Sequence, residues 1–294
     1  MFNKTKHFEI VLIVVALAYL IAFAGIPFFY TAFLSFQEVD PFMINRIMHT
    51  WVGWQNYRDV FSLRQFPSVV WNTAVFLVLS VSAQFIFGFA LALLLRKHFW
   101  GSSVMRGLFL VTWIIPQIAV GIIWVSIFAQ KAGVLNYFLD ALGLSASGLG
   151  WLTTKELSLY SVVVANIWLG IPFNMIFLTV GLMAIPEDLY EAARIDRASA
   201  FNRLRYITLP AMMPTMITVL SLGIIFTLQQ FDLFAAMTNG GPADSSLVMQ
   251  YWSWEFSFQI FEIGKGSAIA TMMLIFVTLV GGVYVHFSRQ DDVA

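Results

Sequence analysis

The chain has 294 residues, of which 60% are hydrophobic and only 11% are charged, and its mean hydropathy is +0.81. This composition is far more apolar than that of a soluble domain of the same length, so it indicates a polytopic membrane protein. The formal net charge is zero, so nothing points to a nucleic-acid partner. The chain contains no cysteine, which excludes disulfides, thiol catalysis and cysteine-ligated metals.

Six apolar stretches are long enough to cross a hydrocarbon core, which needs about 20 helical residues. They lie at residues 10–34, 69–95, 104–129, 159–184, 212–236 and 268–287. None alternates with the period of two that a barrel strand would show. We therefore predict an all-α protein in which residues 1–294 form a single transmembrane domain of six helices.

The distribution of basic residues predicts the orientation of these helices. If both termini are cytoplasmic, ten of the sixteen lysines and arginines lie on the cytoplasmic side, as the positive-inside rule favours. They are Lys4, Lys6, Arg96, Lys97, Arg106, Arg194, Arg197, Arg203, Arg205 and Arg289. A cleaved signal peptide is the alternative for the first stretch, but its apolar run continues past Gly25, which favours a membrane span.

Three external segments connect the predicted helices. Residues 35–67 carry tryptophans and a tyrosine that suit a membrane interface, and residues 130–158 are rich in glycine and serine, with room for one short helix. Residues 238–258 open with Gly240, Gly241 and Pro242, a turn signal that we expect to stop the fifth helix. The aromatic stretch that follows has few charges, so we expect it to be packed.

The cytoplasmic loop at 185–210 has the most ordered pattern. Pro186 suits the first turn of a helix, and Glu187, Asp188 and Glu191 would then lie near its positive end, where carboxylates are stabilised by roughly 0.3–1 kcal/mol each. Small and apolar residues would form one face of this helix. The pattern predicts a short helix that begins directly after the fourth span.

A second short helix is predicted later in the same loop. The first helix breaks near Asp196 and Arg197, and Ser199 is a plausible N-cap for the next one, which Pro210 would end. Two short helices joined by a turn would offer a docking surface. An amphipathic hairpin lying on the lipid headgroups is the alternative.

Specific motifs resemble a known family. The loop reads EAARIDRASAFNRLRYITLP from Glu191 to Pro210, which resembles the EAA loop of membrane permease subunits of binding-protein-dependent ABC importers. Three other segments, WVGWQNYRDVF at 51–61, FPSVVWNTAVF at 66–76 and FDLFAAMTNGGP at 231–242, are similar to the sugar-type permeases of the MalF/UgpA kind. The likeness runs from about residue 51 to residue 266.

This resemblance implies a MetI-like permease in a bacterial or archaeal cytoplasmic (inner) membrane. The expected partners are a second homologous permease, two ATP-binding subunits, an external solute-binding protein, membrane lipid and a carbohydrate solute. A heterodimer of permeases is expected, a homodimer stays open, and the solute is a monosaccharide, an oligosaccharide or a glycerol phosphate. The chain itself would be no enzyme and bind no cofactor, because ATP and Mg would be bound by the ATPase.

The resemblance also implies roles for particular residues. The loop would hold a coupling helix that docks into the ATPase, and the segment after the fifth helix would contact the solute-binding protein. The implied coupling residues are Glu191, Ala192, Ala193, Asp196, Arg197, Ile207, Leu209 and Pro210, and the implied binding-protein contacts are Asn239, Gly240, Gly241 and Pro242.

Arg197 departs from the family pattern, which usually has glycine after the aspartate. Glycine adopts a left-handed turn at little cost, whereas arginine would lose roughly 1 kcal/mol or more. Either the turn is built differently in this chain or the strain is tolerated. We expect the substitution Arg197→Gly to leave transport intact.

The translocation path should be marked by polar groups at membrane depth, since these are costly unless they face a cavity or another helix. Amides and carboxylates bind sugar hydroxyls, and an aromatic face packs on a pyranose ring. Interhelical hydrogen bonds and positions at helix ends are the alternatives for each group. The candidates are Asn166, Trp168 and Asn174 in the fourth helix and Gln229, Gln230 and Asp232 in the fifth.

No residue set in the chain supports catalysis. The sequence GKGS at 264–267 lacks the first glycine of a nucleotide-binding loop, since Gln259 stands there, and we expect it in an external loop. The four histidines, His7, His49, His98 and His286, are scattered, so they predict no metal site. An ion-coupled secondary transporter is the alternative function, but it normally needs several buried ionisable groups, and only Asp232 qualifies.

Overall fold

The computed structural model describes residues 2–43, 49–96, 99–144 and 148–291, with the side chains of 2–8, 43 and 286–291 left out of the description. Lys97, counted among the cytoplasmic basic residues, and His98 lie outside these ranges. The residues divide into two compact units. Unit 1 comprises Met1–Phe66 and Trp252–Ile275, and unit 2 comprises Pro67–Tyr251 and Phe276–Ala294.

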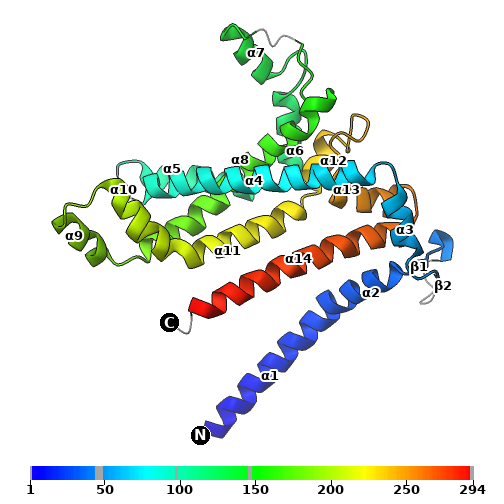
Figure 1. Ribbon diagram of the computed structural model, residues 1–294, viewed down its shortest axis with the longest axis horizontal. Helices are drawn as coiled ribbons and strands as arrows, with labels where there is room; N and C mark the ends of the chain where they lie inside the picture. The colour runs from blue at the N-terminus through cyan, green and yellow to red at the C-terminus, as the bar shows by residue number, and fades with distance from the viewer. Residues whose placement is uncertain (1, 44–48, 97–98, 145–147, 292–294) are drawn as a thin grey trace. The chain divides into compact units, whose positions relative to one another are not determined.

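The helical character of the prediction is confirmed (Figure 1). Five helical segments of the described chain are long and apolar enough to cross a membrane, and a bent pair makes a sixth if it counts as one span. The five are Glu9–Leu34, Phe66–Leu95, Lys155–Met183, Ala200–Leu228 and Ile263–Val285, and the bent pair is Ser102–Ile114 with Gln117–Ile127.

The third predicted span is not one straight helix. Helix α5 (Ser102–Ile114) and helix α6 (Gln117–Ile127) meet at an angle of 100°. Ile115 between them is extended, with φ −63° and ψ 131°, because the residue before a proline is pushed out of the helical region by Pro116. The sequence run at 104–129 therefore forms two helices with a proline corner.

Unit 1 begins with a long apolar helix. It consists of α1 (Phe2–Leu20), a π-helical turn η1 (Ile21–Gly25) and α2 (Ile26–Leu34), which contains Pro27. In η1 the Ile26 amide donates to the carbonyl of Ile21, five residues earlier. Proline has no backbone N–H to donate, and its ring clashes with the carbonyl four residues earlier in an α-helix. The π-helical turn η1, just before Pro27, is wider than an α-helical turn and shifts the backbone hydrogen bonds there.

The rest of unit 1 is a short sheet and helices. Strands β1 (Gln37–Glu38) and β2 (Thr50–Trp51) pair antiparallel, with Gln37 opposite Trp51. Asn56 ties the sheet to its neighbours by donating 2.9 Å hydrogen bonds to the carbonyls of Ser35 and Gln37. The other elements are η2 (Pro41–Met43), α3 (Gln55–Ser62), η4 (Glu255–Gln259) and the first part of α14 (Ile263–Asp291).

The GKGS segment was expected in a loop, and this expectation was wrong. Residues 264–267 lie in the first turns of α14, which begins at Ile263. Gly264 packs against the sheet so closely that a Cβ atom there would lie 2.3 Å from the carbonyl oxygen of Gln37. The glycine thus serves helix packing and belongs to no nucleotide-binding loop.

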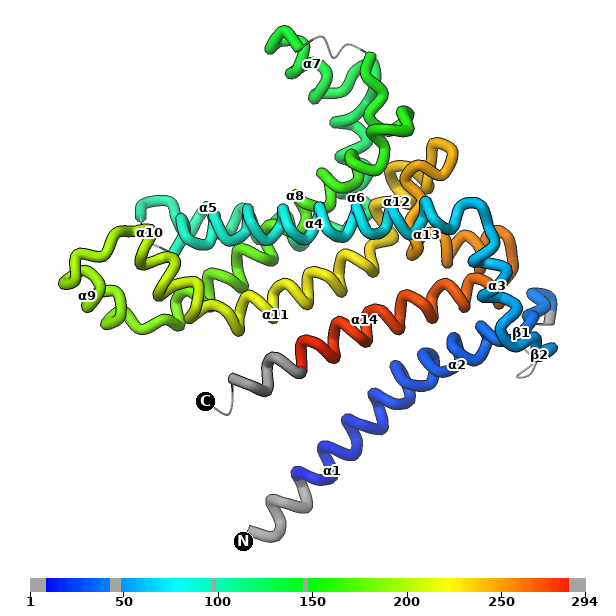
Figure 2. Tube along the Cα trace, viewed as in Figure 1, coloured from blue at the N-terminus to red at the C-terminus, as the bar shows by residue number. Residues whose placement is uncertain are grey.

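Unit 2 contains the helices that carry the predicted sites. In chain order they are α4 (Phe66–Leu95), α5, α6, α7 (Val134–Ala141), α8 (Lys155–Met183), α9 (Glu187–Ile195), α10 (Ala200–Arg203), the π-turn η3 (Leu204–Thr208), α11 (Leu209–Leu228), α12 (Asp232–Met237) and the first half of α13 (Met249–Trp254). Figure 2 traces the tube from α8 through α9 and α10 back into α11. The short helix expected within 130–158 is α7.

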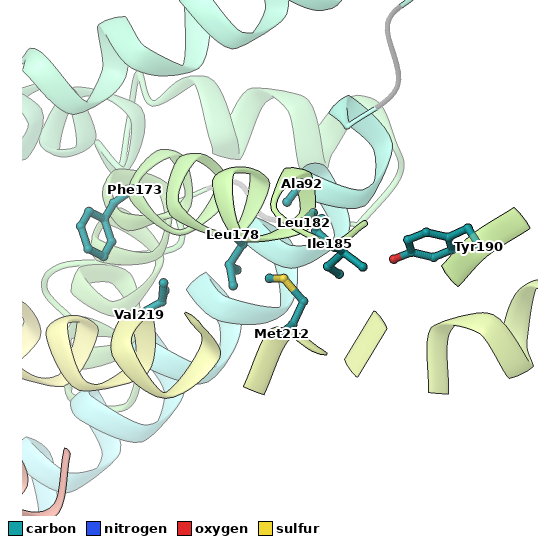
Figure 3. Close-up of a cluster of buried hydrophobic side chains, with 8 residues drawn as sticks. All are labelled: Ala92, Phe173, Leu178, Leu182, Ile185, Tyr190, Met212 and Val219. Carbon is teal, nitrogen blue, oxygen red and sulfur yellow. The ribbon is translucent and has the colours of Figure 1, made fainter. Parts of the chain in front are cut away.

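The core of unit 2 forms between α4, α8 and α11. Leu178 and Leu182 of α8 are fully buried against Met212 and Val219 of α11 and Ala92 of α4 (Figure 3). Because lipid chains are as apolar as leucine, this contact is stabilised by van der Waals packing between the helices. This contact fixes the relative positions of the three helices. These helices carry the predicted pathway residues between 166 and 230 and hold the ends of the 185–210 loop.

The fifth span begins and ends earlier than predicted. Pro210 does not end the second loop helix, because η3 widens the turn before it, and the helix runs on through Pro210 into α11, as it does at Pro27. The span then ends at Leu228, well before Gly240. Gln229 closes the helix with φ −83° and ψ 1°, and Asp232 starts the separate helix α12.

Candidate functional sites

A cavity of about 370 Å³ lies within unit 2 and is lined by polar amides. Gln84 donates from Nε2 to the carbonyl of Asn166 at 2.8 Å, and Gln230 donates from Nε2 to Oδ1 of Asn166 at 3.2 Å. All three side chains are at least nine-tenths buried. The arrangement joins α4, α8 and the end of α11 around one asparagine.

The Nδ2 group of Asn166 has no hydrogen-bond partner among the residues that the structure describes. A buried amide donor without a partner costs roughly 1–3 kcal/mol, so such groups need an explanation. Asn166 lines the cavity, as do the aromatic rings of Trp113, Phe173 and Phe226. The cavity thus combines amide side chains with apolar ring faces, and its described lining includes no charged residue.

Three of the six predicted pathway residues line this cavity, namely Asn166, Gln229 and Gln230. Trp168 does not, because it points to the other side of α8 and meets Trp124 edge-on with ring centroids 6.1 Å apart. Asn174 is buried in the packing of α8 against α4, where Gly88 leaves room for its Cβ atom. Asp232, expected inside the fifth span, lies in the first turn of α12 and does not line the cavity.

Sequence reasoning missed Gln84, Gln117 and Trp113. Gln84 is a buried glutamine in the middle of the 30-residue apolar helix α4, so the rule that had selected Asn166 could also have found it. Gly170 makes its position possible, since a Cβ atom at Gly170 would lie 2.2 Å from the Gln84 side chain. The sequence did not reveal the position of Gln117, because the bend at Pro116 was not predicted and this bend brings the start of α6 to the cavity.

The loop at 185–210 has the two predicted helices, α9 and α10. Helix α9 ends in a Schellman motif: the Arg197 amide donates to the carbonyl of Arg194 at 3.1 Å, and the Ala198 amide donates to that of Ala193 at 2.9 Å. Arg197 occupies the left-handed position with φ 55°, so the glycine turn is retained and its strain is tolerated. Ser199 caps α10 by accepting a hydrogen bond from the Asn202 amide at 3.2 Å.

One side of α9 is anchored to the body of unit 2. The hydroxyl of Tyr190 is 2.9 Å from Oγ1 of Thr208, and both residues are buried. Figure 3 shows the Tyr190 ring reaching toward Ile185. Ala193 is buried on the same side, while Ile207 and Leu209 are half-buried at the start of the returning helix. These contacts hold the loop in one position against α8 and α11.

The opposite side of the loop is exposed. Glu191, Ala192, Asp196, Arg197 and Pro210 are all exposed. The same side carries apolar residues, since Ile195 is 82% exposed and Phe201 is 64% exposed. Exposed apolar side chains beside charged ones suit a contact with a partner protein or with the membrane surface.

The turn at 239–242 is ordered by its own hydrogen bonds. The Asn239 amide donates to the carbonyl of Phe234 at 2.8 Å, and the Ser246 hydroxyl donates to that of Gly241 at 2.7 Å. Asn239 and Gly240 both have positive φ, and Gly240 is buried against Leu247. Pro242 follows, half-buried. The next segment is packed as predicted, with Val248 and Tyr251 buried.

Comparison with known proteins identifies the family. Residues 84–290 match the family model of the binding-protein-dependent transport system inner membrane component. The chain is 32% identical over 98% of its length, and 97% of the relative's, to the trehalose/maltose transport system permease protein MalF of Thermococcus litoralis. It is 30% identical to the sulfoquinovosyl glycerol transport system permease protein SmoG of Agrobacterium fabrum, covering 90% of this chain and 83% of the relative.

A solved structure has the same fold. A chain of a bacterial ABC transporter involved in the import of the acidic polysaccharide alginate superposes with a TM-score of 0.80 at 20% sequence identity, covering 98% of this chain and 96% of that one. These findings favour the importer permease over the ion-coupled secondary transporter. The chain belongs to the family of inner membrane components of binding-protein-dependent transport systems.

Proposed function

We propose that this permease imports a carbohydrate and that its two candidate sites divide the work. The amide cavity contacts the solute, and the exposed side of the 185–210 loop receives the signal of a partner ATPase. The names of the relatives support a carbohydrate solute, since they specify trehalose or maltose and sulfoquinovosyl glycerol. Under this proposal the chain binds no nucleotide, and ATP with Mg is held by the partner.

The cavity chemistry suits a neutral sugar. The unpartnered Nδ2 of Asn166 is a donor for a hydroxyl oxygen, and the exposed end of Gln229 adds a second amide. Trp113 supplies the ring face for the apolar side of a pyranose, the role that Trp168 was expected to take. A lining of amides without a basic residue favours an uncharged solute over a strongly anionic one.

The loop geometry suits mechanical coupling. Glu191, Ala192 and Ile195 share the exposed side of α9, while Tyr190 and Ala193 hold the opposite side to unit 2. A force applied to the exposed side is therefore passed to α8 and α11 through packed contacts. The observation that carries this proposal is the buried Tyr190–Thr208 hydrogen bond beneath an exposed apolar surface.

The full assembly contains a second homologous permease, two ATP-binding subunits and an external solute-binding protein. Both termini and the 185–210 loop face the cytoplasm, and the ordered turn from Asn239 to Pro242 faces the solute-binding protein outside. Closure of the ATPase pair moves the loops as rigid bodies and turns the helices from an inward-open to an outward-open state. Hydrolysis returns the assembly and releases solute inward.

Affinity purification in mild detergent tests the coupling role. The wild-type chain is compared with Glu191→Lys, which reverses a charge on the exposed side of α9 without touching the Tyr190 anchor. Glu156→Lys is the matched control, because Glu156 is also an exposed helical carboxylate but lies at the end of α8 that is distant from the loop. Mass spectrometry identifies the proteins that are recovered with each variant.

We expect the ATPase and a second permease with the wild type and with Glu156→Lys. The ATPase should be lost with Glu191→Lys while the second permease stays. Equal recovery of the ATPase with all three chains would contradict the coupling role of the loop.

A further inference from the structure

A second cavity in unit 2 lies beneath the 185–210 loop, and three arginines are among its lining residues. Its volume is about 670 Å³. Residues from α4, α9, α10 and η3 surround it, so it lies where the loop meets the end of α4. The lining residues that matter here are Leu93, Arg96, Glu187, Arg194, Arg203 and Leu204.

The charges of this cavity do not balance. Glu187 is its one acidic lining residue, and it is shared by two arginines: Arg96 at 3.4 Å and Arg194 in a shorter contact. Arg203 forms no ion pair with any residue in the described part of the chain. Three guanidinium groups and one carboxylate leave an excess of two positive charges around one cavity. Such an excess is stabilised by an anion that enters it.

The cationic groups are held in place before any ligand binds. The Arg96 guanidinium lies 4.4 Å from the centre of the Tyr190 ring, in a cation–π contact. The Tyr190 hydroxyl is in turn fixed by Thr208, which also lines the cavity. Arg96 is therefore oriented by buried neighbours, and its side chain is only 24% exposed.

We propose that this cavity binds a phosphate group, supplied by an anionic phospholipid of the cytoplasmic leaflet. The inference rests on the cytoplasmic position of the loop given under the proposed function. Guanidinium groups bind phosphate oxygens with paired hydrogen bonds. Arg96 directly follows the 30-residue apolar helix α4, which places the cavity at the level of lipid headgroups.

The cavity also has an apolar part that fits a lipid better than a free ion. Leu93 and Leu204 line it beside the arginines. A phospholipid presents a phosphate and acyl chains together, so it can contact both kinds of residue. Bound phosphate would link Arg96 of α4, Arg194 of α9 and Arg203 of α10, and would stiffen the connection through which the loop moves the helices.

The test uses the complete transporter reconstituted in nanodiscs of phosphatidylcholine, with or without phosphatidylglycerol. Native mass spectrometry counts the phosphatidylglycerol molecules retained, and ATP hydrolysis is measured in the same discs. Arg203→Gln removes the arginine that lacks an ion pair. Arg205→Gln is the matched control, because Arg205 is exposed in the same turn, lies near the Tyr206 ring and does not line the cavity.

A basic residue near the membrane surface contributes about 1 kcal/mol of attraction to anionic lipid, which corresponds to roughly fivefold in affinity. We expect Arg203→Gln to lower phosphatidylglycerol retention roughly fivefold and to reduce its stimulation of hydrolysis, with Arg205→Gln unchanged. Inorganic phosphate at millimolar concentration could instead bind to the cavity while phosphatidylglycerol has no effect. That result would retain the phosphate site but show that a lipid is not the source of the phosphate.

Two results would overturn the proposal entirely. One is equal lipid and phosphate binding by Arg203→Gln and the wild type. The other is loss of the ATPase subunit from Arg203→Gln, which would assign Arg203 to the contact with the partner protein instead of to a lipid site. Failure of the coupling role is recognised separately, because it would appear as normal ATPase recovery with Glu191→Lys.

Discussion

The amide cavity and the 185–210 loop, both in unit 2, differ in the kind of energetically unfavourable group that each contains. The cavity keeps a buried polar group without a partner, the Nδ2 of Asn166, within a lining that has no charge. The loop keeps exposed apolar groups, Ile195 and Phe201, within a charged surface. Each exception costs stability in the isolated chain. A buried polar group without a partner suits a small polar solute, whereas exposed apolar side chains suit a protein partner. The kind of unfavourable group thus indicates the kind of ligand.

Removing the free amide should have the largest effect on transport. Asn166→Leu deletes the unpartnered donor and the acceptor used by Gln230. Loss of hydrogen bonds to a bound solute costs roughly 1–3 kcal/mol, so solute uptake should fall about tenfold or more. Trp168→Leu is the control on the same helix, since Trp168 does not line the cavity, and its uptake should stay within about twofold. A normal uptake rate for Asn166→Leu would show that the cavity takes no part in transport.

The packing that supports both sites can be tested at a glycine. A Cβ atom at Gly88 would lie 2.4 Å from Cβ of Asn174 and 3.0 Å from the amide nitrogen of Met175, so Gly88→Ala must push α4 and α8 apart. Overpacking of this kind costs about 1–3 kcal/mol. The midpoint of thermal unfolding in detergent should fall accordingly.

Gly107→Ala is the control for this substitution. Gly107 lies in α5 with nothing within 4 Å of an added Cβ atom, so alanine should stabilise the helix by up to about 1 kcal/mol. The two variants should shift the midpoint in opposite directions. A shift of the same sign and size in both would show that α4 and α8 do not pack as described.

Weakening the anchor of the loop should have a smaller effect. Tyr190→Phe removes the hydrogen bond to Thr208 and should lower the free energy of unfolding by about 1 kcal/mol. Tyr206→Phe is the matched control in the same loop, because Tyr206 is 68% exposed. Chemical denaturation of both variants measures the difference. Equal stability of the two would mean that the Tyr190 hydroxyl does not hold the loop.

The smallest effect on transport is expected at the turn of the loop. Arg197→Gly relieves a left-handed arginine with φ 55° and should raise the free energy of unfolding by about 1 kcal/mol. Uptake should be unchanged, because the exposed guanidinium forms no ion pair among the described residues. A large loss of uptake at normal expression would show that Arg197 has acquired a role of its own.

The loop was largely predictable because its signals are local. The break at Asp196 and Arg197 and the Ser199 cap act within a few residues, and both lie where the pattern indicated. Pro186 was expected in the first turn of α9 but is its N-cap, with ψ 132°, directly before the helix begins at Glu187. Pro210 was misjudged because a proline normally ends or begins a helix, and only the wider turn η3 lets the helix pass through it. That adjustment depends on backbone hydrogen bonds that residue types do not specify.

The cavity was less predictable because it depends on contacts between distant segments. Polarity at membrane depth selected Asn166, Gln229 and Gln230, but also Asn174, whose amide donates to the Gly170 carbonyl of its own helix. The direction of each side chain around α8 follows from packing against Gln84 and the aromatic residues, which the sequence pattern does not specify. The end of α11 at Leu228 likewise has no local stop signal, so Asp232 was placed in the wrong helix.

The most direct test of the account measures solute uptake and ATP hydrolysis in the same proteoliposomes, with the solute-binding protein present. We expect Asn166→Leu to retain the ATPase subunits and hydrolysis but to lose uptake, whereas Glu191→Lys should lose the ATPase and both activities. The division between a solute site and a coupling site would be contradicted if Glu191→Lys still imported solute or if Asn166→Leu released the ATPase.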